Sequence, residues 1–506
     1  MERKELLRHI SFGSQVAEDE RRELATYFVE TDQWRRIANN EIDIIRGEKG
    51  SGKSAIYSLL TERESIFFQR KTILVAGENP RGDTVFRGLV TEPPASEAEF
   101  IILWKLYIIA IIAKDMRKNN IIGEARKVYL LLEDEGLLES DNSLSSLLAA
   151  VQRKVRALMR SLKIENDTTV DELTGLPKLE TKISIGEPLP EAKRRGSLSL
   201  DDMLSALSAE LVRQNYNVWV MLDRLDVAFT ENHDLEANAL RALMRVYGDL
   251  KGFDNIYMKI FIREDIWKRI TEGGFREASH IVRYVLLDWN TSSLLNLLMK
   301  RVLSNNEIVD QFNINRDDVL SNVANQERLF ETLFPSQIEQ GPQKAKTLKW
   351  MITRCADGTK KTAPRELIHL LNCLREEEAK RLEQGGMLPP GNELFDRSVF
   401  KKALPIVSKA RLNQYLYAEY PQERSIVSQL DGQKTEQTPR SLSDLWGCTD
   451  VQAISKARNL VELGFFEERG TRDAPTFWVP FLYRDALNMI QGKAGEILRV
   501  EDLEEE

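Results

Sequence analysis

Short apolar runs alternate with longer stretches of helical period over the first 290 residues of the chain. Five of these runs are rich in β-branched or other large apolar residues, which predicts buried strands. They are Ile42–Ile45, Lys71–Ala76, Val218–Asp223, Ile256–Ile262 and Ile281–Leu287. Strands that alternate with helices are typical of a parallel sheet covered by helices, so the pattern predicts an α/β fold.

The first predicted strand leads into a glycine-rich run, and a helical pattern follows it. The run consists of Gly47, Glu48, Lys49, Gly50, Ser51, Gly52, Lys53 and Ser54, with Ala55 next. A GxxxxGKS run between a strand and a helix is a P-loop pattern. In a P-loop, backbone N–H groups and the positive helix end surround phosphate oxygens, the lysine contacts the β- and γ-phosphates, and the serine ligates Mg²⁺. We therefore expect Lys53 and Ser54 to bind ATP·Mg²⁺; the alternative is a strand-to-helix turn that binds nothing.

The third predicted strand ends in a carboxylate, at the edge where parallel α/β sheets place their ligands. A P-loop protein uses such a group to help hold its metal, so we assign Asp223 to Mg²⁺. We assign Asp226 to orienting or deprotonating the attacking water, although an aspartate there also suits a helix N-cap. Arg224 stands where many ATPases carry a catalytic glutamate, which predicts slow or assisted hydrolysis.

Length and composition fit a large ATPase with added modules. The 506 residues, 42% of them hydrophobic, suffice for more than one domain and a sizeable core. Three cysteines without pair spacing and four histidines without a cluster argue against a disulfide scaffold and a structural zinc. The first residues lack the apolar core of a signal peptide, and the most apolar window, Phe100–Ala113, is too short for a bilayer. We expect a buried helix there, no membrane partner and a cytoplasmic location.

The net charge of −8 argues against a protein whose whole surface binds nucleic acid, because phosphate binding needs accumulated Lys and Arg. Two local runs, Arg153–Lys163 and Lys193–Arg195, carry only basic charges. A solvated helix face is the usual reason for such runs. Charge therefore leaves a nucleic-acid partner open without supporting it.

The C-terminal part has a pattern of its own. Two helical stretches, Ser441–Trp446 and Val451–Leu463, precede two strand-like runs, Gly464–Arg469 and Thr476–Pro480. Two helices followed by a hairpin predict a winged helix, a module that often places its second helix in the major groove of DNA. Because acidic and basic residues roughly cancel from 440 to 499, a protein-contact or structural role is at least as well supported.

Two arginines extend the pattern into a resemblance. The fourth predicted strand is followed by Arg263, and Arg365 begins a later helical stretch. With the P-loop, these features resemble the AAA+, STAND and origin-recognition ATPases. By that resemblance, Arg263 senses the γ-phosphate and Arg365 bridges a helical lid to the nucleotide. From the residues alone, Arg263 pairs equally well with Asp265 or Glu264, and Arg365 is equally well a surface charge after Pro364.

More narrowly, the chain resembles a bacterial P-loop ATPase family whose members often lie near antiphage defence genes. The segments that carry this resemblance are Phe12–Gly13, Glu18–Glu20, Gly50–Ala55, Asp223–Asp226, Phe261–Asp265 and Phe477–Arg484. The resemblance covers almost the whole chain, and it implies a role in antiviral defence.

The predicted fold class is α/β: a P-loop NTPase parallel sheet with a helical insertion, a helical lid and a C-terminal winged-helix-like domain. Within the insertion, Ile164–Arg195 is rich in Pro, Gly, Asp and Thr, which predicts a loop. The expected parts are an N-terminal helical segment (1–40), the ATPase core (41–290) with its insertion (about 97–200), the lid (291–395), the winged helix (396–499) and an acidic tail (500–506).

Three functions share these features. In the first, ATP switches a regulatory ATPase that controls an effector on another chain or assembles into a homo-oligomer, since nothing in the sequence is typical of a nuclease. In the second, an origin-recognition-like ATPase acts on DNA through the winged helix. The third, a small-molecule kinase, is disfavoured by the sensor-like arginines, the lid and the winged helix. The sequence favours the first, and leaves the choice of an arginine finger open among Arg241, Arg245, Arg269 and Arg276.

Overall fold

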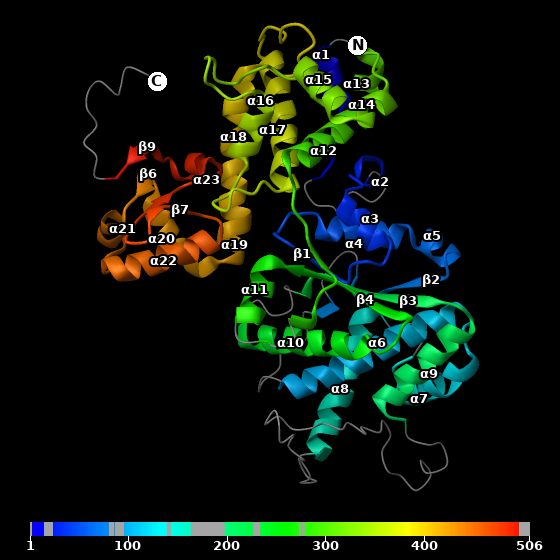
Figure 1. Ribbon diagram of the computed structural model, residues 1–506. Helices are drawn as coiled ribbons and strands as arrows, with labels where there is room; N and C mark the ends of the chain where they lie inside the picture. The colour runs from blue at the N-terminus through cyan, green and yellow to red at the C-terminus, as the bar shows by residue number, and fades with distance from the viewer. Residues whose placement is uncertain are drawn as a thin grey trace. The chain divides into compact units, whose positions relative to one another are not determined.

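Figure 1 shows a computed structural model of the chain. It describes residues 3–14, 24–79, 85–86, 96–138, 143–162, 198–225, 233–272, 275 and 279–494. Contacts group the chain into two compact units. We call Asp32–Glu48 with Gly52–Leu287 the sheet unit, and Met1–Thr31 with Lys49–Ser51 and Asp288–Glu506 the helical unit. The tip of the glycine-rich run thus groups with the helical unit.

The sheet unit contains a five-stranded parallel sheet in the order β2-β3-β4-β1-β5. Its strands are β1 (Ile44–Gly47), β2 (Thr72–Ala76), β3 (Asn217–Leu222), β4 (Ile256–Arg263) and β5 (Tyr284–Leu286). All five predicted strands are confirmed, with ends that differ by at most three residues. Parallel neighbours need a crossover connection, which explains why helices separate the strands along the chain.

Helices cover both faces of this sheet. Figure 1 shows α3, α4 and α5 on one side of it and α6, α9 and α10 on the other. The helices of this unit are α3 (Asp32–Ala38), α4 (Lys53–Glu62), α5 (Glu64–Gln69), α6 (Glu97–Lys118), η3 (Gly123–Ala125), α7 (Arg126–Asp134), α8 (Leu144–Leu162), α9 (Leu200–Arg213), α10 (His233–Leu250) and α11 (Glu264–Glu272). The α/β class with a helical insertion is therefore confirmed.

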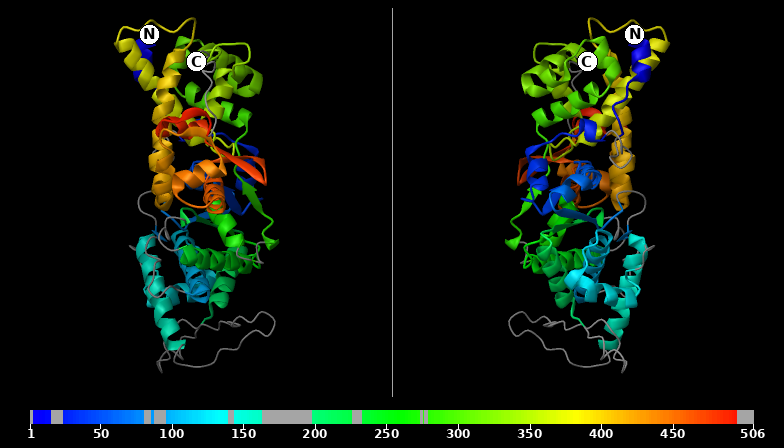
Figure 2. Two further views of the ribbon diagram at one scale, coloured as in Figure 1. Left: turned by 90° about the vertical axis from the view of Figure 1, so that its left-hand side faces the viewer. Right: turned by 90° about the vertical axis from the view of Figure 1, so that its right-hand side faces the viewer.

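Helix α6 contains the most apolar window of the sequence. It begins with a capping box, in which the Ser96 hydroxyl accepts from the Glu99 N–H and the Glu99 carboxylate accepts from the Ser96 N–H. Its side chains from Phe100 to Ala113 are mostly buried, as predicted, and it packs against α10 and α8. Figure 2 shows α6 to α8, light blue to cyan, together in both views. Among the described residues, no helix combines the length and the apolarity that crossing a membrane requires.

Several sequence predictions fall outside the described residues. They include the loop at 164–195, the acidic tail at 500–506, the segment Glu18–Glu20, the basic run Lys193–Arg195, the end of the run Arg153–Lys163, and the residues Asp226 and Arg276. The predicted domain boundaries stay predictions.

The helical unit is built mainly around α17 and α18. Its helices up to residue 430 are α1 (Arg3–His9), α2 (Leu24–Tyr27), α12 (Thr291–Leu303), α13 (Asn306–Gln311), α14 (Arg316–Ser321), α15 (Val323–Leu333), α16 (Thr347–Arg354), α17 (Pro364–Glu383), α18 (Arg397–Ala410), the π-helix η7 (Arg411–Leu416), α19 (Tyr417–Glu419), η8 (Pro421–Glu423), α20 (Arg424–Val427) and η9 (Ser428–Leu430). Figure 2 shows α1, dark blue, beside α17, yellow. The Arg8–Glu383 ion pair (2.9 Å) joins these two helices.

The last part of the helical unit has the predicted winged-helix-like order. Helices α21 (Pro439–Trp446) and α22 (Asp450–Glu462) precede the antiparallel hairpin of β7 (Glu467–Thr471) and β8 (Ala474–Trp478). The remaining elements are β6 (Lys434–Gln437), α23 (Phe481–Arg484), η10 (Asp485–Leu487) and β9 (Ile490–Lys493), and the sheet order is β7-β8-β6-β9. Strands β6 and β9 were not predicted, because each is short and polar.

Candidate functional site

The glycine-rich run forms the loop between β1 and α4. Gly50 and Gly52 have φ values of 83° and 101°, a left-handed conformation that glycine adopts without strain. Gly52 is the N-cap of α4 and offers no side chain, so no side-chain hydrogen bond caps the helix. The Nζ atom of Lys53 donates to the backbone oxygens of Gly47 (2.8 Å) and Glu48 (2.9 Å). The loop thus folds around its own lysine, with the first amides of α4 uncapped by any side chain.

The sheet order brings the three strand ends that the sequence singled out to one edge. Strand β4 lies between β1 and β3, and Gly47 is directly opposite Arg263 in the β1–β4 register. On the other side of β4, Leu222 lies opposite Ile260, so Asp223 follows at the same edge. Asp223 is buried, at 3% exposure. Gly47, Asp223 and Arg263 therefore lie at neighbouring strand ends, as parallel topology requires. Lys53, the first residue of α4, reaches the same edge through its hydrogen bond to the Gly47 oxygen.

Arg263 has a carboxylate partner within the sheet unit. Its Nε and Nη2 atoms donate to the two carboxylate oxygens of Asp265, at 3.1 and 2.9 Å. Of the two partners that the sequence left open, Asp265 makes the contact. Glu264 instead makes a bidentate pair with Arg46 of β1, at 2.9 and 2.6 Å.

Sequence reasoning missed Glu78, a buried carboxylate beside Asp223. The Gly77 N–H donates to the Met221 oxygen (2.9 Å), which extends the β2–β3 pairing and places Glu78 next to the end of β3. Glu78 is fully buried, and its carboxylate accepts from the Asn79 N–H (2.8 Å). Burial raises the pKa of the neighbouring Tyr57 hydroxyl, and the charges of Asp223 and Glu78 raise it further. The sequence did contain a signal for Glu78, because an acidic residue follows the second predicted strand by two positions.

Asp226, the candidate for orienting water, lies outside the described residues. The preceding strand β3 ends at Leu222, and Arg224 adopts a positive φ of 56°. A non-glycine residue in this region is uncommon and marks a sharp change of chain direction just after Asp223. The roles predicted for Asp226, as a catalytic group or as a helix N-cap, both stay predictions.

The tip of the loop, Lys49 to Ser51, makes its contacts within the helical unit. The Lys49 ammonium pairs with the Glu419 carboxylate and lies 5.6 Å from the centre of the Tyr415 ring. The Trp289 Nε1 atom donates to the Ser51 oxygen at 2.8 Å. A Cβ atom built at Gly50 would lie 3.2 Å from the Cβ of Arg365. Arg365 is therefore beside the glycine-rich tip, at the second position of α17.

These residues fit a phosphate ligand and, through it, a metal. The Ser51 hydroxyl and the Arg365 Nε atom are both buried without a hydrogen-bond partner. Both are donors, and phosphate oxygens are acceptors, so an anion at the loop would satisfy them. Ser54 and Asp223 are the residues that would hold Mg²⁺ beside that phosphate. No group of three or more metal-ligating side chains occurs in the part of the chain that the structure describes.

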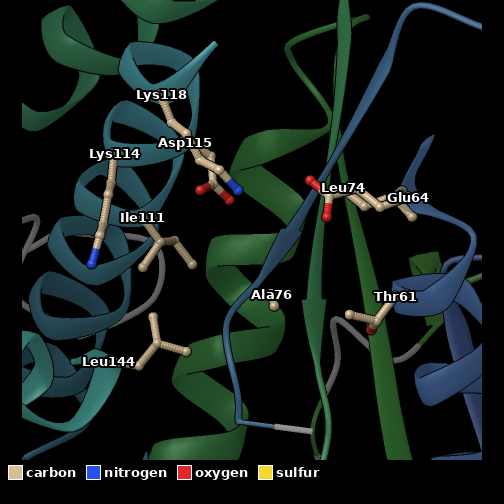
Figure 3. Close-up of a pocket in the computed structure, with 9 residues that line it drawn as sticks. All are labelled: Thr61, Glu64, Leu74, Ala76, Ile111, Lys114, Asp115, Lys118 and Leu144. Atoms are coloured by element: carbon tan, nitrogen blue, oxygen red, sulfur yellow. The ribbon is translucent and has the colours of Figure 1, made fainter. Parts of the chain in front are cut away.

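A cavity of about 210 Å³ lies elsewhere in the sheet unit, along the edge strand β2. Figure 3 shows Glu64 and Asp115 approaching it from opposite sides of β2. Burial raises the pKa of Asp115 to about 6, Lys118 opposes this shift, and Glu64 adds to it. None of the residues predicted to bind nucleotide lines this cavity.

The chain has only weak similarity to known proteins. No protein-family model matches the chain, and no curated protein matches it. The Orc1 protein of Aeropyrum pernix, solved in complex with DNA, aligns over 92% of this chain and 97% of its own at 12% identity, with a TM-score of 0.34. The A. pernix Orc2 protein (ADPNP–ADP complexes) aligns over 88% of this chain and 86% of its own at 11% identity, with a TM-score of 0.29. Cdc6p of Pyrobaculum aerophilum aligns over 94% of this chain and 95% of its own at 12% identity, with a TM-score of 0.30.

Proposed function

We propose that the chain binds ATP·Mg²⁺ at its P-loop and acts as a regulatory ATPase of the AAA+ and origin-recognition type. The observation that carries the proposal is the loop between β1 and α4. Two glycines in it have positive φ, and the first amides of α4 have no side-chain cap, an arrangement that suits anion binding at a helix N-terminus. The buried, unpartnered Ser51 hydroxyl in the same loop supports an anionic ligand.

In this proposal each residue of the site has one role. Lys53 contacts the β- and γ-phosphates, and Ser54 and Asp223 hold Mg²⁺, which offsets charge on the phosphate oxygens when bound. Arg365 contacts the nucleotide from α17, and its position beside Gly50 supports this role. Arg263 senses the γ-phosphate, for which it has to exchange its Asp265 partner for phosphate oxygens.

Hydrolysis is expected to be slow. Arg224 occupies the position after Asp223, and a cation there cannot accept a proton from water. Asp226 is our candidate for orienting the water, so Asp226→Asn is expected to bind ATP and hydrolyse it far more slowly. Unchanged turnover of that variant would favour the alternative role of Asp226 as a helix N-cap.

We propose that the nucleotide state controls a partner, either an effector on another chain or a second copy. The resemblance to defence-associated ATPases suggests antiviral defence as the setting. In phage-challenged cells, the proposal expects the Lys53→Ala variant to lose protection. Protection by that variant at the wild-type level would contradict the defence role.

DNA binding through the winged-helix-like region is the second candidate. The order α21, α22 and hairpin favours it, because the second helix of such a module can enter the major groove. The charge of α22 weakens it, because Arg458 pairs with Glu468 of β7 at 2.8 Å. A guanidinium that is already paired is a weaker phosphate ligand.

The deciding experiment measures the mass of the purified protein in solution. It is recorded with ATP·Mg²⁺, with ADP and without nucleotide, each in the presence and absence of duplex DNA. Assembly driven by ATP alone supports the regulatory switch. A change that needs DNA shifts the conclusion to the DNA-binding candidate. Calorimetric titration with ATP·Mg²⁺ accompanies the mass measurement. Absence of ATP binding by the wild-type protein would contradict both candidate functions.

A further inference from the structure

A buried arginine, Arg411, joins three segments of the helical unit. It begins the π-helix η7, which interrupts the run of α18 into α19. Its Nη1 atom donates to the Glu366 carboxylate at 2.7 Å, and its Nε atom donates to the Tyr483 hydroxyl at 3.2 Å. Its Nη2 atom lies 3.8 Å from the Asp357 carboxylate. One guanidinium thus holds α17, α23 and the turn before α17.

The electrostatics of this group keep Arg411 charged. Burial by itself lowers the pKa of Arg411, but its four polar neighbours outweigh burial and raise that pKa well above the ordinary value. They are Tyr483, Glu366, Tyr415 and Asp357. A guanidinium presents its donors in a fixed planar fork, a geometry that a lysine ammonium does not reproduce.

Arg411 contacts α17 at Glu366, the residue next to Arg365, which we propose binds the nucleotide. Glu366 follows Arg365 directly in the first turn of α17, and it is buried at 5% exposure. The Oε1 atom of Glu366 accepts from Arg411. Its Oε2 atom is buried without a hydrogen-bond partner. Loss of Arg411 would leave this buried carboxylate without a compensating charge, so the first turn of α17 would have to move to expose it to water. The position of Arg365 therefore depends on Arg411.

The other contacts of Arg411 lead to the winged-helix-like region. Tyr483 belongs to α23, directly after β8, and its ring packs on Phe465. The turn that contains Asp357 also meets this region, because the Gly358 N–H donates to the Gly464 oxygen at 2.7 Å. A Cβ atom at Gly358 would lie 2.1 Å from the Phe466 oxygen, so this close approach of the two backbones requires glycine.

A fourth contact of Arg411, to Tyr415, leads to the tip of the P-loop. The Arg411 guanidinium lies 3.7 Å from the centre of the Tyr415 ring, within the same π-helix. Lys49 lies near the same ring and pairs with Glu419 of α19. Single π-helical turns within longer helices are frequent at functional sites.

We propose that Arg411 is a positioning residue that holds Arg365 at the nucleotide and transmits the nucleotide state to the winged-helix-like region. This inference rests on the proposed function and names the route of its regulation. Arg365 changes its contacts when ATP is bound. Through Glu366 that change reaches Arg411, and through Tyr483 it reaches α23 and the elements packed on it.

The test measures hydrogen exchange of α22 (Asp450–Glu462) with and without ATP·Mg²⁺, together with the Kd for ATP. In the wild-type protein, ATP is expected to change the exchange rate of α22. Tyr483→Phe removes only one hydroxyl of the cluster. It is expected to bind ATP within about twofold of wild type and to lose at least roughly half of the α22 response.

Two further variants separate positioning from general stability. Arg411→Lys keeps the charge but loses the fork, so we expect an ATP Kd about 5- to 10-fold weaker and no α22 response. Tyr417→Phe is the matched control, because it removes a hydroxyl from the adjacent helix α19 outside the cluster, and we expect wild-type behaviour from it.

Each outcome is decisive. A full α22 response in Tyr483→Phe would overturn the inference, even if Arg411→Lys fails to fold. ATP binding by the wild-type protein without any change in α22 would also overturn it, while leaving the proposed function intact. Absence of ATP binding by the wild-type protein would instead contradict the proposed function.

Discussion

The P-loop and the Arg411 cluster are built in opposite ways. The P-loop consists of consecutive residues, and its geometry comes from backbone dihedral angles at Gly50 and Gly52. The Arg411 cluster consists of side chains that lie 45 and 72 residues from Arg411 in sequence, Glu366 and Tyr483. A site made of backbone keeps its shape when one side chain is removed. A cluster of buried charges does not, because the partner that remains is left without compensation.

A second buried cluster, at the start of β1 in the sheet unit, refines this comparison. Lys259 of β4 donates to the Asn40 side chain (2.6 Å) and to the Asp43 carboxylate (3.1 Å), and Asp43 also accepts from Arg283 (2.7 Å). Burial lowers the pKa of Lys259 to about 8, although Asp43 opposes the shift. The pKa of Arg411 shifts the other way, because four polar neighbours outweigh its burial, whereas near Lys259 Asp43 opposes the shift and the Arg283 charge adds to it. A buried cation is thus not by itself a functional signal; its neighbours decide.

The largest expected effect is on stability, at Glu366. The Glu366→Ala variant leaves Arg411 buried without its closest carboxylate, which is expected to cost about 3–5 kcal/mol. Urea unfolding followed by hydrogen exchange in α17 measures this. Glu366→Gln keeps a neutral acceptor and is expected to lose less. Equal stability of Glu366→Ala and wild type would remove the distinction between the two kinds of site.

The next effect is on binding, at Lys53. The Lys53→Ala variant is expected to bind ATP·Mg²⁺ about 100-fold more weakly, or about 2.7 kcal/mol. Its unfolding midpoint is expected to fall only slightly, because the two hydrogen bonds from Lys53 to the loop backbone are lost while the conformation set by the glycines is kept. Calorimetric titration gives the Kd, and Lys127→Ala, an exposed lysine of α7, is the control. Unchanged affinity would show that the loop is not the nucleotide site.

A smaller, pH-dependent effect is expected at Asp115, in the cavity beside β2. Its pKa is raised from 3.8 to about 6, so the folded state binds more protons than the unfolded state between these pH values. Stability therefore falls as pH rises through this window. Asp115→Asn removes the charge and is expected to raise stability at pH 7 by about 1–3 kcal/mol, with no gain near pH 4. Thermal melts across pH measure this, against the exposed Asp254→Asn. A gain that is equal at both pH values would rule out titration as its cause.

The smallest effect is expected at Arg458 of α22. Its ion pair with Glu468 is exposed, so Arg458→Ala is expected to leave the unfolding midpoint unchanged. If α22 does not contact DNA, affinity for a duplex and its dependence on salt are also unchanged. A weaker, less salt-dependent affinity in the variant would support the DNA-binding candidate.

The fold was largely predictable because its signals are local. The five strands, α6 and the order of α21, α22 and the hairpin all follow from apolar runs, periodicity and turn residues within short windows. Strands β6 and β9 were missed for the same reason, since they are polar and depend on pairing with β8 and with each other. The candidate site was predictable where it is contiguous, from Gly47 to Ser54.

The sequence by itself determined the P-loop pattern, the strand that leads to Asp223 and the winged-helix-like order, because backbone conformation depends on neighbouring residues. Only the tertiary structure decided that Arg263 pairs with Asp265, that Glu78 is buried beside Asp223 and that Arg411 joins Glu366 to Tyr483. These contacts depend on which side chains meet after the elements pack. Such pairings leave no periodic trace along the chain, so packing alone selects them.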